Sequence, residues 1–431
     1  MDDSPNNTTS IKDQILTMGA QALEASRELA TFDSDHKNRI LLAMADRLIA
    51  DEAIILEANA KDITAAEKNG LTSAMIDRLK LDPQRLAGIA DGIRQVAKLH
   101  DPVGELLEEW VPKNGITIRK KRTPIGVIGI IYESRPNVTS DAGVLCFKTG
   151  NAVILRGGSE AIHSNRAIAD SLQNGGMAEG MPQHAVQLIP FTDRESVKHM
   201  AEMDQYLDLI IPRGGAGLIE TVVSLARMPV IKHYDGICHA YVDVDANLDM
   251  AEAITINAKT QKPSVCNALE TLLIHQDVAE KFAPLIAESL RENKVQLIAD
   301  EKFIKLIDKS NPHIEVQAAT EADWRTEYLD LILSIKIVAD QDEAMNHINH
   351  YGSHHSDVII TDNETHANRF LAEVDSAAVF WNCSTRFSDG EEFGFGAEIG
   401  ISTDKLHARG PMALKELTSY KYQLIGTGQV R

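Results

Sequence analysis

The chain has 431 residues, which is long enough for two or three domains that each bury a core of their own. Hydrophobic residues make up 44% and charged residues 25% of the sequence, a composition that excludes an intrinsically disordered protein. The excess of 63 Asp and Glu over 43 Lys and Arg gives a net charge of −20, which argues against nucleic acid as a partner. An anionic substrate would therefore need a local cluster of cations.

The N-terminus and the cysteine content indicate a cytoplasmic protein. Residues 1–10 are acidic and polar, typical of a flexible tail, and show no signal or transit peptide. The longest apolar run, at residues 125–132, is far too short to cross a membrane. The four cysteines are widely spaced and form no CxxC pair, so we expect reduced thiols and no disulfide framework.

The first hundred residues have the periodicity of helices, with apolar residues that recur at helical spacing at Leu41, Leu42, Met44, Ala45, Leu48 and Ile49. An Asn-Gly turn at residues 114–115 between two β-like segments predicts a hairpin. The apolar run that follows, at residues 125–132, predicts a buried strand.

Strands and helices then alternate along the rest of the chain. The predicted strands are residues 125–132, 153–155, 186–189, 207–211, 241–242, 271–274, 331–338, 358–361 and 379–381, with helices between most of them. This alternation predicts an α/β fold with mostly parallel sheets, because βαβ units connect parallel strands. We place a domain boundary near Asp235-Gly236 and find no internal repeat.

Two glycine-rich loops each join a predicted strand to a predicted helix. The first, at residues 156–159, contains Arg156 and Gly157, and the second, at residues 212–217, contains Gly214 and Gly215. Backbone N–H groups in such a turn can approach a phosphate, and two of these loops in neighbouring βα units favour a dinucleotide. Neither has the full GxGxxG spacing, and a plain strand-to-helix turn explains each loop taken alone.

Cys266 stands in a segment that joins a predicted helix to a predicted strand. A thiol there can be exposed and close to a helix dipole, which suits a nucleophile. The alternative is a buried cysteine that acts as a small hydrophobic residue, and this fits Cys146 and Cys238, which lie in apolar runs. Cys383, beside polar residues, is the second candidate for a nucleophile.

His347, His350, His354 and His355 fall within nine residues, a spacing that allows a metal site. Asp357 is the only nearby carboxylate. We therefore interpret these histidines as residues that cap and brace a loop through hydrogen bonds, and we predict no metal.

Several segments together resemble the aldehyde dehydrogenase superfamily, and within it the enzymes that reduce an acyl phosphate. The segments are YESRPNV at residues 132–138, GNAVILRGGSE at 150–160, PSVCN at 263–267, TEYLD at 326–330 and CSTRFSDGEEFGFG at 383–396. The last is the most specific. The stretch from Val338 to Asp357 also matches, and the resemblance extends from about residue 11 to Arg431.

The resemblance implies a Rossmann-like cofactor domain, an α/β catalytic domain and a small β-flap for oligomerisation. We assign residues 11–105 and 122–235 to an NADP-binding domain, residues 236–410 to the catalytic domain, and residues 106–121 and 415–431 to the flap. A homo-oligomer, either a dimer or a tetramer, is therefore expected. The resemblance also implies a separate glutamate 5-kinase as the source of the substrate.

The implied reaction is the reduction of L-glutamyl 5-phosphate by NADPH to L-glutamate 5-semialdehyde and phosphate, the second step of proline biosynthesis. Cys266 would attack the acyl phosphate and form a thioacyl enzyme, and the Asn137 amide would stabilise the oxyanion. Hydrolytic relatives carry a glutamate base near the position of His233, where this chain has no carboxylate. The match there is loose, and His233 is given no role.

The remaining site residues are also implied by the resemblance. Those expected to bind the cofactor are Arg156, Gly157, Ser159, Gly214, Gly215 and Glu327. We expect NADPH rather than NADH, because Ser159 stands where NAD-preferring relatives often carry a glutamate and Arg156 offers a fork for phosphate or ribose oxygens. Glu327 is expected to hold the nicotinamide ribose.

Arg135, Thr385 and Arg386 are the expected substrate-binding residues, because the substrate carries a carboxylate and a phosphate. For Arg386 a surface ion pair with Asp389 or Glu391 is the alternative. Two other functions stay open at this point: another superfamily member that hydrolyses its thioacyl intermediate or passes it to CoA, and a catalytically inactive binding protein.

Overall fold

The computed structural model describes residues 10–133 and 135–431, so the predicted tail lies, apart from Ser10, outside the described residues. The chain divides into two compact units. One consists of Met1–Lys232, Phe395–Gly400 and Met412–Arg431, and the other of His233–Gly394 and Ile401–Pro411. Among the described residues, no helix combines the length and the apolar character that a membrane span requires.

Helices make up the N-terminal part of the first unit: α1 (Ile11–Leu29), α2 (Ser34–Ala50), α3 (Glu52–Lys68), α4 (Ser73–Leu79) and α5 (Pro83–Lys98). The side chains of Ser10, Asp33 and Asp82 cap α1, α2 and α5 by accepting a backbone N–H of the first turn. In α2 the predicted apolar face is only partly correct. Leu42 and Ile49 are exposed, because they fall outside the stripe that faces the core.

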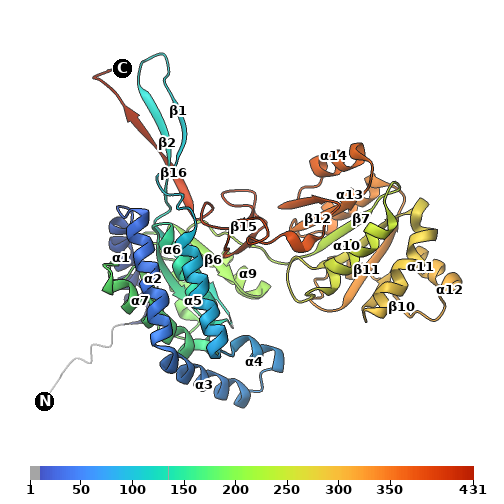
Figure 1. The fold of residues 1–431 in the computed structure, drawn as a ribbon, viewed down its shortest axis with the longest axis horizontal. Helices are drawn as coiled ribbons and strands as arrows, with labels where there is room; N and C mark the ends of the chain where they lie inside the picture. Colours follow the sequence, from blue (N-terminus) through green and yellow to red (C-terminus); the bar gives the residue numbers. More distant parts are fainter. Residues whose placement is uncertain (1–9, 134) are drawn as a thin grey trace. The chain divides into compact units, whose positions relative to one another are not determined.

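A parallel sheet of four strands forms the centre of the first unit, in the order β5-β4-β3-β6. The strands are β3 (Val127–Tyr132), β4 (Ala152–Arg156), β5 (Val186–Leu188) and β6 (Leu209–Arg213). They alternate with α6 (Pro136–Lys148), α7 (Ile162–Ala178), α8 (Glu195–Ala201) and α9 (Ala216–Leu225) (Figure 1). All residues of β3 are buried, as its apolar run predicts. Because parallel strands end at the same edge, the loops after β3, β4 and β6 lie along one edge of this sheet.

A three-stranded antiparallel sheet projects from the first unit (Figure 1). It is built from β1 (Leu106–Trp110), β2 (Thr117–Pro124) and β16 (Thr418–Ile425). β1 and β2 form the predicted hairpin, and the C-terminal strand pairs with β2 along its whole length. These strands lie in the segments assigned to the flap, except that β2 extends three residues beyond the predicted end at residue 121.

The second unit contains a parallel sheet of seven strands in the order β10-β9-β11-β8-β7-β12-β13. In chain order they are β7 (Cys238–Val242), β8 (Leu269–His275), β9 (Gln296–Ala299), β10 (Val316–Ala318), β11 (Ile332–Val338), β12 (Ser356–Ile360) and β13 (Ala378–Trp381). Their registers are parallel throughout, as the βαβ alternation predicts.

Helices cover both faces of this second sheet: α10 (Leu248–Thr260), α11 (Gln276–Glu292) and α12 (Glu301–Ser310) on one, α13 (Gln341–Tyr351) and α14 (Glu364–Glu373) on the other (Figure 1). Alternate residues of β7 divide between the two cores, with Ala240 in the first and Tyr241 in the second. The short strands β9 and β10 and the helices α12 and α14 were not predicted.

Short elements complete the chain. They are the 3-10 helices η1 (Ser159–Ala161), η2 (Asp323–Arg325) and η3 (Thr385–Phe387) and the paired strands β14 (Gly400–Ser402) and β15 (Gly410–Met412). The first and the last of the 3-10 helices contain candidate site residues, Ser159 and Thr385.

Candidate active site

The four cysteines differ in their access to solvent. Cys146 and Cys238 are fully buried, and burial raises the pKa of both thiols far above the usual range. Cys266 and Cys383 are half-buried, and burial raises the pKa of the Cys383 thiol as well. Two of the four side chains are therefore unsuited to attack a substrate, as their apolar sequence context predicts.

Cys266 lies in the turn between α10 and β8, and its backbone is closely packed. A Cβ atom on Gly236 would come within 2.1 Å of the Cys266 carbonyl oxygen and within 2.5 Å of its Cα atom. The thiol of Cys238 donates to the same carbonyl oxygen across 3.2 Å. These contacts hold the turn that carries the candidate nucleophile.

The residue after the candidate nucleophile, Asn267, joins this turn to the loop around η3. The Asn267 side-chain Nδ2 donates to the backbone oxygen of Ser388 at 3.0 Å and more weakly to that of Arg386 at 3.4 Å. The Thr385 hydroxyl donates to the Asn267 backbone oxygen at 2.7 Å. The structure thus brings the predicted residues Thr385 and Arg386 to the turn that carries Cys266, although they lie far apart in the sequence.

The guanidinium of Arg386 also contacts this turn. It donates to the side-chain oxygen of Asn267 and, across 2.9 Å, to Oε1 of Gln261. Among the ion pairs of the described residues, none joins Arg386 to Asp389 or Glu391. The surface ion pair considered as an alternative for this arginine is therefore not formed.

Glu327 reaches the same region from the loop before β11. Its Oε1 atom accepts the backbone N–H of Gly236 at 2.9 Å, beside the backbone of Cys266. Burial raises the pKa of the Glu327 carboxyl, and the bond from Gly236 opposes this effect. The structure thus places Glu327 next to the glycine on which the cysteine turn packs.

A buried ion pair supports this arrangement and was not predicted. Lys259 on α10 donates to Glu270 on β8 at 2.8 Å, and both side chains are completely buried. The other carboxylate oxygen of Glu270 accepts the backbone N–H of Leu329 at 3.3 Å, two residues beyond Glu327. The bond from Leu329 therefore links the loop that carries Glu327 to β8, and Lys259 balances the charge of the Glu270 carboxylate that accepts it.

Asn137 belongs to the first unit and stands in the first turn of α6, directly after Pro136. Its Nδ2 atom donates to Oδ2 of Asp141 at 2.8 Å, one helical turn further along. Burial raises the pKa of the Asp141 carboxyl to about 6, and the bond from Asn137 opposes the rise. Arg135 is the N-cap residue of the same helix and is exposed. Asp141 was not predicted, although its spacing of four from Asn137 was a usable signal.

The loop after β4 contains Arg156, Gly157 and Ser159. Arg156 is buried, and its guanidinium donates to the backbone oxygen of Thr192 at 2.9 Å and weakly to Oγ of Ser196 at 3.4 Å. A Cβ atom on Gly157 would overlap the side chain of Asn165. Arg156 thus holds the loop before α8, whereas Ser159 is exposed at the same edge of the sheet.

The loop after β6 contains Gly214 and Gly215 and leads into α9. The backbone N–H of Gly215 donates to Oε2 of Glu133 at 3.1 Å, and a Cβ atom on Gly214 would lie 2.5 Å from the same oxygen. The space around Gly215 itself is open. The N-terminus of α9 therefore already binds a carboxylate oxygen. The open space and the N–H donor at Gly215 suit an anionic group of a cofactor. Glu133 was not predicted to take part.

Of the four clustered histidines, His347 and His355 are buried, His354 is half-buried and His350 is exposed. His347 is buried beside the rings of His239 and Trp324, and burial lowers the pKa of its imidazole to about 2. His355 is buried, with Nδ1 2.9 Å from Oγ of Ser356. His233 packs its ring edge-on against His355, with 6.0 Å between ring centroids.

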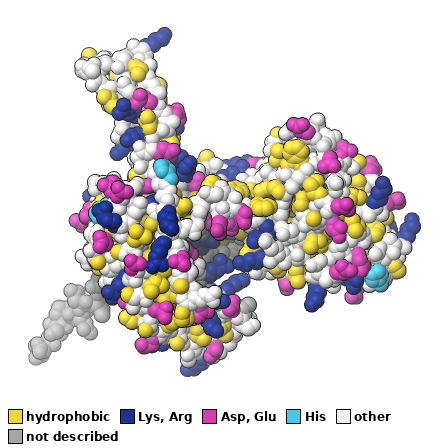
Figure 2. All heavy atoms as spheres, viewed as in Figure 1, with side chains coloured by type: hydrophobic (Ala, Val, Ile, Leu, Met, Phe, Trp, Pro, Cys, Tyr) yellow, Lys and Arg dark blue, Asp and Glu magenta, His cyan; other side chains and the backbone are white. Residues whose placement is uncertain are grey.

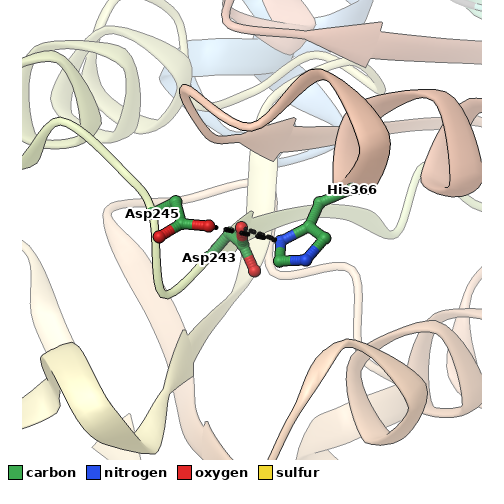
Figure 3. A group of neighbouring side chains, drawn as sticks. All are labelled: Asp243, Asp245 and His366. Atoms are coloured by element: carbon green, nitrogen blue, oxygen red, sulfur yellow. Dashed lines mark hydrogen bonds and ion pairs between the residues drawn. The ribbon is translucent and has the colours of Figure 1, made fainter.

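One group of side chains in the described part of the chain has the composition of a metal site: Asp243, Asp245 and His366 (Figure 3). The buried Asp243 carboxylate accepts bonds from Nδ1 of His366 at 2.7 Å and from the hydroxyl groups of Thr361 and Tyr241. These hydrogen bonds join α14 to β7 and β12 and account for the cluster without an ion.

The chain belongs to the aldehyde dehydrogenase family, whose model matches residues 7–310. This membership makes the protein an oxidoreductase and implies a nicotinamide cofactor. Curated relatives identical at about half of their positions are gamma-glutamyl phosphate reductases. The one from Caldanaerobacter subterraneus is 53% identical over 95% of this chain and 98% of its own length, and the one from Enterococcus faecalis is 53% identical over 96% and 98%.

Solved structures agree with this membership. The gamma-glutamyl phosphate reductase of Thermotoga maritima is similar with a TM-score of 0.94 and 44% identity, and the match covers 97% of this chain and all of that one. The acetylating aldehyde dehydrogenase of Geobacillus thermoglucosidasius has a TM-score of 0.68 at 15% identity over 98% of each chain, which shows a shared fold. The predicted aldehyde dehydrogenase-like α/β fold is therefore confirmed.

Proposed function

We propose that the protein reduces L-glutamyl 5-phosphate to L-glutamate 5-semialdehyde and phosphate, with NADPH as the reductant, in the biosynthesis of proline. The names of its relatives support the substrate, because gamma-glutamyl phosphate reductases match nearly the whole chain. The observation that carries the proposal is the half-buried Cys266, in a turn held by Gly236, Asn267 and the Arg386 loop.

In the proposed reaction Cys266 acts as the nucleophile. Its thiolate attacks the acyl carbon, the bond to the phosphate oxygen breaks and phosphate leaves, so that a thioester is formed. The Asn137 amide stabilises the negative charge that develops on the acyl oxygen. A bound nicotinamide cofactor would supply the hydride that reduces the thioester carbon. Cys266 then leaves as thiolate, and the aldehyde is released.

The residues of the first unit suit an anionic dinucleotide. In the turn of Gly214 and Gly215 only the space around Gly215 is open, and the N–H of Gly215 already binds a carboxylate, so this N–H suits an anionic group. Ser159 is the better candidate to face a 2′-phosphate, because the Arg156 guanidinium is used to hold the Thr192 loop. Glu327 is assigned to the nicotinamide ribose.

Arg386 and Arg135 are the cations proposed for the substrate's carboxylate and phosphate. The net charge of −20 offers no general attraction for an anion, so local cations must supply it. Thr385 has a supporting role in this proposal, because its buried hydroxyl holds the cysteine turn.

The location and the assembly of the enzyme are part of the proposal. Four free cysteines fit a reducing cytoplasm. Homo-oligomerisation is assigned to the projecting sheet, on which Trp110, Tyr420, Tyr422 and Leu424 are exposed. Figure 2 shows hydrophobic and charged side chains interspersed over the visible face of this sheet. A separate glutamate 5-kinase would supply the substrate.

The reverse reaction tests the chemistry. Semialdehyde and NADP should give at most about one NADPH per active site without phosphate, and steady turnover once phosphate or arsenate is added, because His233 stands near the position where hydrolytic relatives carry their glutamate base. Cys266→Ala should abolish turnover and retain cofactor binding, whereas Cys383→Ala should stay active. Steady turnover without phosphate would favour a hydrolytic enzyme, and a requirement for CoA would favour a CoA-acylating one.

A further inference from the structure

The Asp141 carboxylate has an unusual setting on α6. It is half-buried and accepts a hydrogen bond from Nδ2 of Asn137 at 2.8 Å. Among the ion pairs of the described residues, none includes Asp141. A carboxylate that is partly withdrawn from water and has no cation beside it is costly, which is consistent with the raised pKa of this group. Stability alone therefore does not explain an aspartate at this position.

The chemistry of the pair suggests what the carboxylate does. A side-chain amide has one end that donates two hydrogen bonds and another that only accepts, and the two ends have nearly the same shape. An ionised carboxylate accepts hydrogen bonds and cannot donate them. If the Asn137 amide turned over, its oxygen would face the carboxylate of Asp141, and the two would repel each other.

We propose that Asp141 is a positioning residue that fixes the orientation of the Asn137 amide, so that one N–H is bound to the carboxylate and the second stays available for the oxyanion. This inference rests on the proposed function, in which Asn137 stabilises the acyl oxygen. Without this restraint, a turned amide would present its oxygen to a developing negative charge.

The hydrogen bond between Asn137 and Asp141 depends on their spacing of four residues. Residues at this spacing lie on one face of a helix, one turn from each other. Pro136 fixes the start of α6 immediately before Asn137 and needs no N–H partner of its own in the first turn. Asn137 is thus held on both sides, by the helix start and by Asp141.

Three substitutions at Asp141 distinguish positioning from a structural role. In Asp141→Asn the new amide can donate to the oxygen of Asn137 as readily as it accepts from Nδ2, so the Asn137 amide loses its fixed orientation. We expect kcat for L-glutamyl 5-phosphate to fall roughly two- to tenfold, with KM and the Kd for NADPH nearly unchanged. Asp141→Ala also leaves the Asn137 amide free to turn and should lower kcat to a similar extent. Asp141→Glu, which keeps the acceptor, should retain more activity than Asp141→Asn.

A merely structural role gives a different order, because the isosteric Asp141→Asn would be clearly milder than the cavity left by Asp141→Ala. That order, or an Asp141→Asn enzyme as fast as the wild type, would overturn the inference. Asp170→Asn on α7 is the matched control and should have wild-type kcat. Asn137→Ala distinguishes the proposed role of Asn137 from that of Asp141. If Asn137→Ala keeps wild-type kcat, the proposed role of Asn137 is wrong. If Asn137→Ala is slow and Asp141→Asn is as fast as the wild type, only the positioning role of Asp141 is wrong.

Discussion

Gly236 and Cys266 lie backbone against backbone, so close that a Cβ atom on the glycine would come within 2.1 Å of the cysteine's carbonyl oxygen. The atoms in the way belong to the main chain and cannot rotate aside as a flexible side chain would. The position of the candidate nucleophile therefore depends on the absence of a side chain at residue 236.

Gly236→Ala should displace the cysteine turn and lower kcat by about two orders of magnitude, because a shift of an ångström at a reacting group has an effect of that size. Steady-state kinetics with L-glutamyl 5-phosphate measure it. Gly88→Ala in α5 is the control, since nothing lies within 4 Å of its new Cβ atom. The control should be fully active and more stable by about 0.5–1 kcal/mol. Normal activity of Gly236→Ala would show that the turn adjusts at little cost.

Arg386→Lys should raise KM for the acyl phosphate roughly tenfold and lower kcat by a smaller factor. Lysine cannot donate to Asn267 and Gln261 at once, so both the proposed anion contact and the support of the cysteine turn are weakened. Arg369→Lys on α14, where the arginine pairs with Asp342 and Glu373, is the matched control and should leave both constants unchanged. An unaltered KM in Arg386→Lys would remove this residue from the substrate site.

Glu133→Gln should tighten NADPH binding about two- to fivefold, because the incoming phosphate no longer competes with a carboxylate for the N–H of Gly215. Titration of the protein's fluorescence at low salt measures the Kd. Glu179→Gln, at the end of α7, is the control and should bind as the wild type does. Weaker binding by Glu133→Gln would mean that the carboxylate supports the cofactor instead of competing with it.

The second unit should lose stability as the solution becomes acidic. Burial lowers the pKa of His347 to about 2 from a usual value of 6.5, so the unfolded chain takes up the proton first. Above pH 6.5 neutral His347 makes its full contribution to the free energy of unfolding. Below pH 6.5 this contribution decreases by up to about 1.4 kcal/mol per pH unit. Urea unfolding at pH 7.5 and 5.5 measures the difference. His347→Phe should have a smaller difference, whereas the exposed His313→Asn should retain it.

Much of the fold could be predicted from the sequence because the relevant signals are local. The alternation of apolar strands and helices identified both parallel sheets, and the Asn-Gly turn identified the β1–β2 hairpin. β9 and β10 have only four and three residues and lack a signal of their own. α12 did carry one, since Asp300 caps it and Phe303 and Ile307 share its buried face.

For the candidate site, the sequence predicted which residues take part but not their contacts. Motifs pointed to Cys266, Asn137 and Arg386, but they carry no information on what each side chain touches. The contacts of Gly236 with Cys266 and of Glu133 with Gly215 join residues that are far apart in the sequence, so only the folded chain reveals them. Arg156 illustrates the same limit, because its buried guanidinium holds the Thr192 loop.

The last part of the chain completes the first unit. Met412–Arg431 belongs to it, and β16 covers the edge of β2 with a complete set of antiparallel pairs. On the ribosome all of the second unit is synthesised before β16. The edge of β2 that pairs with β16 therefore stays open while translation continues for tens of seconds. An open strand edge is a template for association with other chains. Messages that end early, or ribosomes that stall before residue 418, should therefore yield chains that aggregate through β2.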